Sequence, residues 1–295
     1  MEDHNTELYR VISLESFLSL LYYQAERYVR PIGFWEDTYE GYMLHYLDSE
    51  EGEKKLLRTL YNDIVNHREH DAIKNYVKLL HARYLCYGQC WSTEPDSDAI
   101  WRIYSYGNKS IQLVTTYDRI LRTITSESDW NGKEPRIEMV QYDSKEVPIE
   151  ESVSKYFTSG MPVDEPYFHK RYAFQHEHEV RVILNDVKRY YTIMSAWCMM
   201  LDSNYDIANA ELPGTAFEDK AIYAINKLKR SDHTVLHLNK APKELFVRID
   251  GLNRYIIGIH VHPKAESWYV DLIHKICDQH CICFLGQSEL YNKPP

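Results

Sequence analysis

The stretch of residues 172–184, Tyr-Ala-Phe-Gln-His-Glu-His-Glu-Val-Arg-Val-Ile-Leu, most narrowly limits what this chain can fold into. Its β-branched and aromatic residues, with no Pro or Gly among them, predict a β-strand. Because strand side chains alternate between two faces, Glu177, Glu179 and Arg181 are expected to project together from one face. Like charges two positions apart repel, so a sheet seldom places them together for stability alone. The pattern therefore indicates a functional site, with two carboxylates held beside an arginine on a rigid strand.

Helical and strand patterns alternate along the rest of the chain. Residues 53–85 form the clearest helical region, with apolar residues at helical spacing. Further helices are expected at 14–21, 98–104, 117–124, 220–229 and 265–277, and strands at 7–12, 111–116, 136–142, 245–250, 255–261 and 281–285, with another buried element at 191–200. Ser13 is expected to cap the first helix. Since no linker or repeat divides it, the chain 1–295 is expected to form a single α+β domain whose mostly antiparallel sheet is flanked by helices.

Charge and composition exclude several classes of partner and site. The formal net charge of −10 gives no general attraction to DNA or RNA. No run of about 18 apolar residues occurs, which excludes a membrane span, and the acidic start Met-Glu-Asp-His does not resemble a secretory signal. The six cysteines are therefore interpreted as reduced thiols of a cytoplasmic protein. With only eleven glycines and no Gly-rich loop, neither a Rossmann site nor a P-loop is expected.

Metal sites have two candidate patterns, and neither has the usual spacing. The C-terminal segment combines Cys277, His280, Cys281 and Cys283, and His-x-His pairs occur at 176–178 and 260–262. A structural zinc site needs four ligands in tetrahedral array, and this spacing lacks a paired second knuckle. We therefore expect no metal, with the cysteines and histidines in ordinary packing. A metal-dependent nuclease that uses Asp250, Glu177 and Glu179 stays a third functional alternative.

Four segments resemble a family of bacterial proteins called domain of unknown function 2971. They are Leu8-Tyr9-Arg10, the turn from Arg30-Pro31 to Phe34-Trp35-Glu36-Asp37, the block Cys90-Trp91-Ser92 with residues 99–104, and the run Glu177-His178-Glu179-Val180-Arg181. Their order and spacing match the family over most of the chain. The turn departs from the family's usual Asn-Asp-Pro form, because Asp37-Thr38-Tyr39 stands there. The family name implies no activity, so the chemistry has to come from the residues.

The order of these segments is also similar to ADP-ribosyltransferases of the Arg–Ser–Glu type. That resemblance implies a split antiparallel sheet that holds NAD⁺, as substrate, in the gap between its halves. It implies that Glu179 stabilises an oxocarbenium-like transition state, that Glu177 orients or deprotonates the acceptor, and that Ser92 steadies Glu179 and the ribose. The residues that it implies for NAD⁺ binding are Tyr9, Arg10, Trp91 and Arg181.

The first functional hypothesis is therefore an NAD-dependent ADP-ribosyltransferase or an NAD glycohydrolase. The resemblance extends this hypothesis to a toxin or phage-defence effector, with a protein or nucleic-acid acceptor, a partner protein in a defence system and no membrane partner. The alternative from a different class is a non-catalytic sensor that binds a nucleotide or a partner protein. An enzyme should bring Arg10, Ser92, Glu177 and Glu179 together in one open cleft, whereas a binding module should have an open cleft in which those residues are scattered or paired away.

Overall fold

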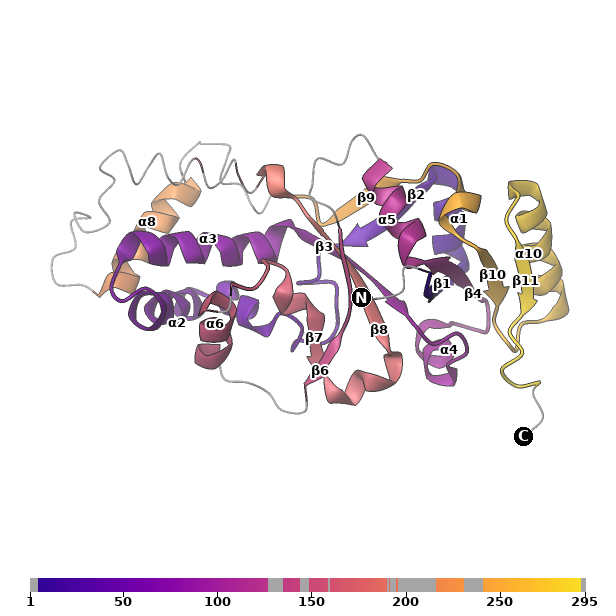
Figure 1. Ribbon diagram of the computed structural model, residues 1–295, viewed down its shortest axis with the longest axis horizontal. Helices are drawn as coiled ribbons and strands as arrows, with labels where there is room; N and C mark the ends of the chain where they lie inside the picture. Colours follow the sequence, from indigo (N-terminus) through magenta and orange to yellow (C-terminus); the bar gives the residue numbers. More distant parts are fainter. Residues whose placement is uncertain are drawn as a thin grey trace.

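The computed structural model describes residues 5–126, 135–143, 149–158, 160–189, 191, 195, 216–230 and 241–292 (Figure 1). The element expected at 191–200 lies almost entirely outside them, as does Cys198. The strands are β1 (Glu7–Ser13), β2 (Ala25–Val29), β3 (Cys86–Ser92), β4 (Ser110–Thr116), β5 (Arg136–Met139), β6 (Gln141–Asp143), β7 (His169–Arg171), β8 (Glu179–Asn185), β9 (Glu244–Arg248), β10 (Gly258–Val261) and β11 (Phe284–Gln287). The α-helices are α1 (Leu14–Tyr23), α2 (Glu50–Thr59), α3 (Glu69–Leu85), α4 (Asp98–Tyr104), α5 (Tyr117–Ser126), α6 (Ile149–Thr158), α8 (Phe217–Arg230), α9 (Leu252–Tyr255) and α10 (Ser267–His280). Short 3₁₀ or π turns are η1 (Tyr42–Asp48), η2 (Leu60–Ile64), η3 (Glu165–Phe168) and η4 (Tyr172–Glu177).

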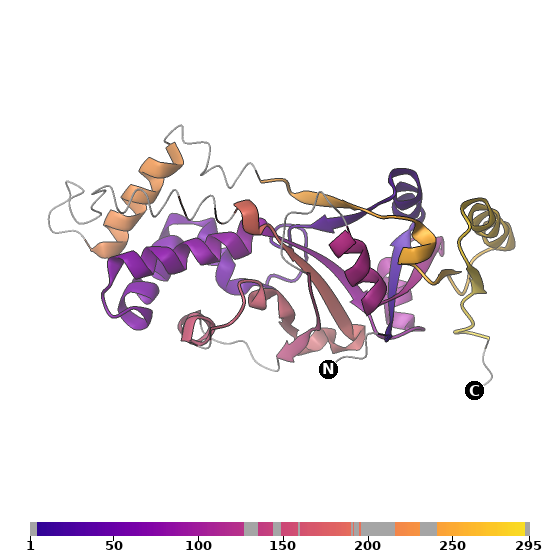
Figure 2. The same ribbon diagram turned by 45° about the horizontal axis from the view of Figure 1, so that its top comes forward.

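The expected α+β class and the mostly antiparallel sheet are confirmed. Nine strands form one sheet in the order β11-β10-β4-β1-β3-β2-β9, and β8 pairs with β3 and β5. Within it, β10 and β11 run parallel and the other described pairs are antiparallel. A second, small sheet consists of the parallel strands β6 and β7. The described residues form one body, in which β3 and β8 lie between a helical end and a sheet-rich end (Figures 1 and 2).

The large sheet forks at β3. One edge of β3 pairs with β8 along its whole length, from Cys86 opposite Asn185 to Ser92 opposite Glu179. Its other edge meets β2 at Gly88 and β1 at Ser92, one residue pair each. The branch β2-β9 and the branch β1-β4-β10-β11 therefore diverge from β3 on that side.

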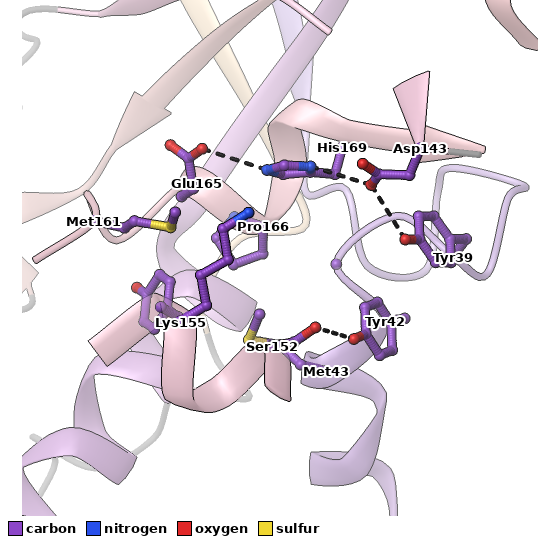
Figure 3. A pocket seen from close by; sticks show the side chains of 12 residues that line it. Tyr39, Tyr42, Met43, Asp143, Ser152, Lys155, Met161, Glu165, Pro166 and His169 are labelled. Atoms are coloured by element: carbon purple, nitrogen blue, oxygen red, sulfur yellow. Dashed lines mark hydrogen bonds and ion pairs between the residues drawn. The ribbon is translucent and has the colours of Figure 1, made fainter. Parts of the chain in front are cut away.

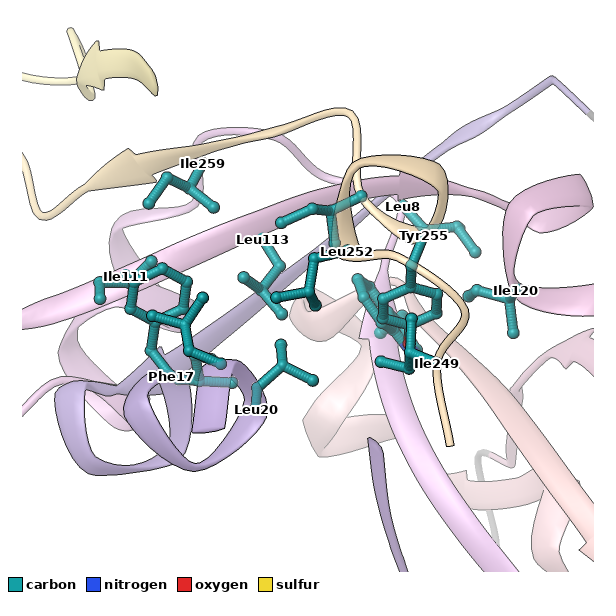
Figure 4. Packing of buried hydrophobic residues seen from close by; sticks show 14 of the residues in the cluster. Leu8, Phe17, Leu20, Ile111, Leu113, Ile120, Ile249, Leu252, Tyr255 and Ile259 are labelled. Atoms are coloured by element: carbon teal, nitrogen blue, oxygen red, sulfur yellow. The ribbon is translucent and has the colours of Figure 1, made fainter. Parts of the chain in front are cut away.

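Two large apolar cores hold most of the described helices against this sheet, and a small third cluster packs Ile100 and Trp101 of α4 on Val11 of β1. Over the forked part, side chains from α1, α5 and α9 pack on β1, β4 and β10, and Figure 4 shows Phe17, Leu113 and Leu252 meeting there. Ser13 caps α1 as expected, since its Oγ accepts a hydrogen bond of 3.2 Å from the backbone N–H of Ser16. At the other end, α2, α3, α6 and α8 enclose a second core around Leu56. No helix of the described residues is long and apolar enough to cross a membrane.

The expected strand over 172–184 is wrong in its first half. Residues 172–177 form the 3₁₀ turn η4, and His178 takes a left-handed conformation (φ 42°) before β8 begins at Glu179. The physical reason lies in tertiary contacts, which override strand propensity. The turn packs the Phe174 ring against the ammonium of Lys170, at 4.8 Å, and directs Glu177 to the same ammonium.

Candidate functional site

Five charged side chains contact one another on one face of β8. They are Glu40, Lys170, Glu177, Glu179 and Arg181, and none is more than 7% exposed. We call them the charge cluster. Its members come from the loop before η1, from β7, from the end of η4 and from β8. Charged groups are almost never fully buried unless they are paired, so their contacts decide what they can do.

Lys170 is the common partner of the three carboxylates in the charge cluster. Its Nζ lies 2.6 Å from Glu177 Oε2, 3.1 Å from Glu179 Oε2 and 3.4 Å from Glu40 Oε1. The ammonium therefore balances the charge of three carboxylates at once. Within the described residues, no group of three or more His, Cys, Asp and Glu side chains is arranged to hold a metal.

Arg181 fixes Glu179 from the other side. Its Nε and Nη2 donate to the two Glu179 carboxylate oxygens at 2.8 and 3.0 Å, a bidentate pair. Arg181 also donates to Glu40 and to the backbone carbonyl of Tyr167, and it stacks 4.1 Å from the ring of Trp35. Both oxygens of Glu179 are therefore held by cations of the protein itself.

The pKa shifts agree with these contacts. Burial opposes ionisation of Glu179, but Arg181 and Lys170 outweigh it and lower the pKa of that carboxyl to about 2. Burial likewise opposes the charged form of Lys170, yet Glu179 and Glu40 raise the pKa of the amine. For Glu40, burial dominates and raises the pKa despite Arg181. Glu179 is thus a permanent carboxylate at neutral pH.

Ser92 and Tyr9 lie next to the charge cluster but do not touch its carboxylates. The Ser92 hydroxyl donates to the backbone carbonyl of Glu177 at 2.8 Å and accepts from the N–H of Glu94 at 3.0 Å. Ser92 therefore holds the chain turns at the ends of β3 and η4. Tyr9 is paired with Ser92 across β1 and β3, and its hydroxyl donates to Glu7 at 2.5 Å.

Arg10 and Trp91 lie on the opposite face of the sheet from the charge cluster. Because strand side chains alternate, the pairing that puts Ser92 beside Glu179 sends Trp91 to the other side. There, Arg10 pairs with Glu26 at 2.9 Å, and its guanidinium stacks 5.7 Å from the Trp91 ring. The structure therefore brings Ser92, Glu177 and Glu179 together but separates Arg10 and Trp91 from them by the sheet.

A cavity of about 80 Å³ lies beside the charge cluster, between η1, α6 and the segment 161–169 (Figure 3). We call it the tyrosine pocket; its lining includes Tyr39, Tyr42, Tyr156, Asp143, Ser152 and His169. None of the residues predicted for catalysis or for NAD⁺ binding lines it. Lys155 is exposed, and its side chain extends across the pocket toward Pro166.

His169 connects two carboxylates at the edge of the tyrosine pocket. Its Nδ1 lies 3.2 Å from Asp143 Oδ2, and its Nε2 lies 3.4 Å from Glu165 Oε1. The hydrogen bond to Glu165 chiefly raises the pKa of His169, and the same bond, together with Arg136, lowers the pKa of Glu165 to about 2. Arg136 donates to the other Glu165 oxygen at 2.7 Å. These partners fix the imidazole ring in place.

Two stacked tyrosines form one wall of the pocket. The rings of Tyr39 and Tyr42 have centroids 5.2 Å apart and planes inclined by 10°. Tyr39 donates to Asp143 Oδ2 at 3.1 Å, and the Tyr42 hydroxyl is hydrogen-bonded to Ser152. Gly41, between them, has φ 64°, a left-handed conformation that favours glycine. The wall is therefore held in place before any ligand arrives.

The sequence alone did not indicate this pocket, although it contains weak signals of it. Ser152 and Lys155 are three residues apart on α6, a spacing that places both on one helix face. His169 and Lys170 are neighbours on β7, so alternation sends one to the pocket and the other to the charge cluster. Neither signal identifies a pocket without the long-range contacts of Tyr39 and Tyr42.

The other residues weighed as metal ligands in the sequence do not form a metal site within the part of the chain that the structure describes. Asp250, expected beside Glu177 and Glu179 in a nuclease, is 83% exposed and pairs with Arg254 at 2.8 Å. Cys277 is buried, whereas Cys281 and Cys283 are exposed, and none of the five described cysteines is in a disulfide.

Comparison with known proteins gives no further assignment. The chain matches no protein-family model, no curated protein and no solved structure. The resemblances to domain of unknown function 2971 and to ADP-ribosyltransferases therefore stay predictions, and the function has to be argued from the two sites.

Proposed function

We propose that this protein is a binding module whose site is the tyrosine pocket. The single observation that carries the proposal is a cavity whose polar groups, Asp143, His169 and Ser152, are already oriented by hydrogen bonds to their neighbours. Ligand sites are typically concave and mostly apolar, with a few well-placed polar groups. A sensor or ligand-binding protein uses such a site without chemistry.

The contacts of the charge cluster also favour the binding module over the NAD-dependent enzyme. Glu179 could act on a substrate only by leaving Arg181 or Lys170, and breaking a buried ion pair costs about 3–5 kcal/mol. A substrate at Glu179 would also find Arg10 on the far face of the sheet. The carboxylates of the charge cluster are paired with Lys170 and Arg181, and the cavity is lined by other residues, which together favour a binding module over an enzyme.

A fragment screen by ligand-observed NMR tests the proposal. The library contains single-ring fragments together with NAD⁺ and AMP. Ser152→Phe places an aromatic ring in the pocket, and Ser154→Phe, two residues along α6 and not part of the lining, is the matched control. We expect at least one ligand to bind the native protein and Ser154→Phe and to be lost in Ser152→Phe. Ligands that bind all three proteins equally, or no ligand at all, would contradict the proposal.

A second candidate function is the NAD-dependent transferase or glycohydrolase. The observation in its favour is that Glu177 and Glu179 share Lys170, with Ser92 bound to the Glu177 backbone, and that Glu179 is ionised as oxocarbenium stabilisation requires. Its test is mass spectrometry of NAD⁺ incubated with the protein and a cell lysate, beside Glu179→Ala. Nicotinamide release that is lost in the variant supports the enzyme and identifies a protein or nucleic-acid acceptor. Intact NAD⁺ with both folded proteins rejects it.

A further inference from the structure

The size of the tyrosine pocket limits its ligand. A buried water needs about 10–15 Å³ of such a cavity, so about 80 Å³ holds roughly five to eight atoms of that size. One ring with a short substituent is about the size that this space accepts. A whole dinucleotide would leave most of its surface outside.

The walls of the pocket favour an aromatic ring. Tyr39 and Tyr42 stack in parallel, and Tyr156 adds a third phenol ring to the lining. Met43, Met161 and Pro166 supply apolar surface on other sides. Aromatic rings prefer offset or edge contacts with other rings, and methionine sulfur also packs well on them. A flat ring therefore gains more from this lining than an aliphatic chain of the same size.

The charges around the pocket favour an uncharged ligand. Asp143 and Glu165 share the imidazole of His169, and Glu165 is paired with Arg136 as well. Because each of these carboxylates already contacts a basic side chain of the protein, a charged ligand would lose its hydration and would have to compete with these contacts for a counter-charge. Lys155 is exposed, where solvent screens its charge. An anion or a cation in the pocket would therefore be penalised.

The polar groups match one substituent in particular. A serine hydroxyl has one donor and two acceptor sites, and Ser152 uses one of them for Tyr42. Asp143 uses the same oxygen, Oδ2, for Tyr39 and for His169, and its side chain is 30% exposed. A primary amide offers a carbonyl acceptor to a hydroxyl and N–H donors to a carboxylate. Both groups border the tyrosine wall, where they are hydrogen-bonded to its two phenols (Figure 3).

We infer that the tyrosine pocket binds a single uncharged aromatic ring that carries a carboxamide-type substituent. This inference rests on the proposed binding function and adds the chemical class of the ligand. Its test uses three probes of nearly the same shape and different charge: benzamide, benzoate and benzamidinium. Cyclohexanecarboxamide, which keeps the amide and lacks the aromatic ring, is the fourth.

Protein-observed NMR titration at pH 7 gives the four dissociation constants. We expect benzamide to bind at least about tenfold more tightly than either charged probe, and more tightly than cyclohexanecarboxamide. Ser152→Phe should abolish benzamide binding, and Ser154→Phe should leave it unchanged. Ser152→Ala, which removes only a hydroxyl from a half-buried position, should weaken it up to about tenfold.

The outcomes separate this inference from the proposed function. Tighter binding of benzoate or benzamidinium overturns the ligand class, while loss in Ser152→Phe would still support a binding pocket. Equal binding of benzamide to native protein and to Ser152→Phe and Ser152→Ala places its site elsewhere and overturns the inference. If none of the four probes binds, the inferred ligand class is wrong. If, in addition, the fragment screen finds no ligand whose binding is lost in Ser152→Phe, the proposed binding function is rejected too.

Discussion

Replacing Lys170 with Met removes the cation that the three carboxylates of the charge cluster share. Methionine nearly preserves the length and volume of the lysine stem, so the change tests the charge more than the packing. Three carboxylates and two cations give the cluster a net charge of −1, and without Lys170 three carboxylates and one cation give −2. The contacts that are lost lie at 2.6, 3.1 and 3.4 Å, and among the described residues Arg181 pairs with Glu40 and Glu179 but not with Glu177.

The expected loss is large because the site is buried. Removing one partner of a buried ion pair costs about 3–5 kcal/mol, since a carboxylate is left without compensation. For chains of 150–250 residues, 1 kcal/mol shifts the melting temperature by about 2–4 °C, so Lys170→Met should lower it by about 6–20 °C. A second change, Glu177→Gln, returns the net charge to −1, and we expect the double variant to recover about 1–3 kcal/mol.

Urea denaturation followed by circular dichroism measures both effects. The control is Arg254→Met, because Arg254 and Asp250 form a pair at 2.8 Å with side chains 76% and 83% exposed. An exposed pair contributes less than about 1 kcal/mol, so this variant should unfold almost as the native protein does. A loss below about 1 kcal/mol in Lys170→Met, or no recovery in the double variant, would refute the reasoning that the cluster is held by buried charge pairing.

Three further predictions follow from single contacts. Gly88→Ala places a Cβ 2.6 Å from a ring carbon of Trp35, so overpacking should cost about 1–3 kcal/mol and change tryptophan fluorescence; native stability and spectrum would contradict it. Glu165 has its pKa lowered from 4.5 to about 2, so its stabilisation is complete above about pH 4.5 and is lost as the pH falls toward 2. Glu165→Gln should remove this acid-dependent part of the unfolding free energy, with His169 as its principal partner, and an unchanged pH profile would count against the contact. Ser13→Ala should cost about 0.5–2 kcal/mol and speed amide exchange in the first turn of α1, and equal exchange would rule out the cap.

Local chemistry explains which elements were predictable from the sequence. The helix expected at 98–104 is α4, and the strand expected at 111–116 lies within β4, because apolar spacing and polar flanks agree there. The strand expected at 136–142 is divided between β5 and β6, which pair with different partners. Partner choice depends on distant segments, so a periodic pattern could not reveal that division.

The candidate site was even less predictable from local sequence patterns than the strands were. Alternation correctly placed Glu179 and Arg181 on one face of a strand, but the same rule wrongly extended the strand to Glu177. The sequence order of Arg10, Ser92 and Glu179 carried no information about faces. Their faces depend on the register of β1 and β8 against β3, which is set by contacts 80 or more residues apart in the chain.

The charge cluster and the tyrosine pocket share the same two chain segments. In the loop before η1, Tyr39 faces the pocket and Glu40 the cluster, and on β7 His169 faces the pocket while Lys170 faces the cluster. A buried ion pair is weak support for stability, because hydrophobic side chains of similar volume often serve as well. It is better suited to fixing geometry, since each charge tolerates few alternative positions without a partner. The charge cluster therefore fixes the two segments that carry Tyr39 and His169. The pocket is ordered by charged side chains that do not line it and that a bound ligand would not contact.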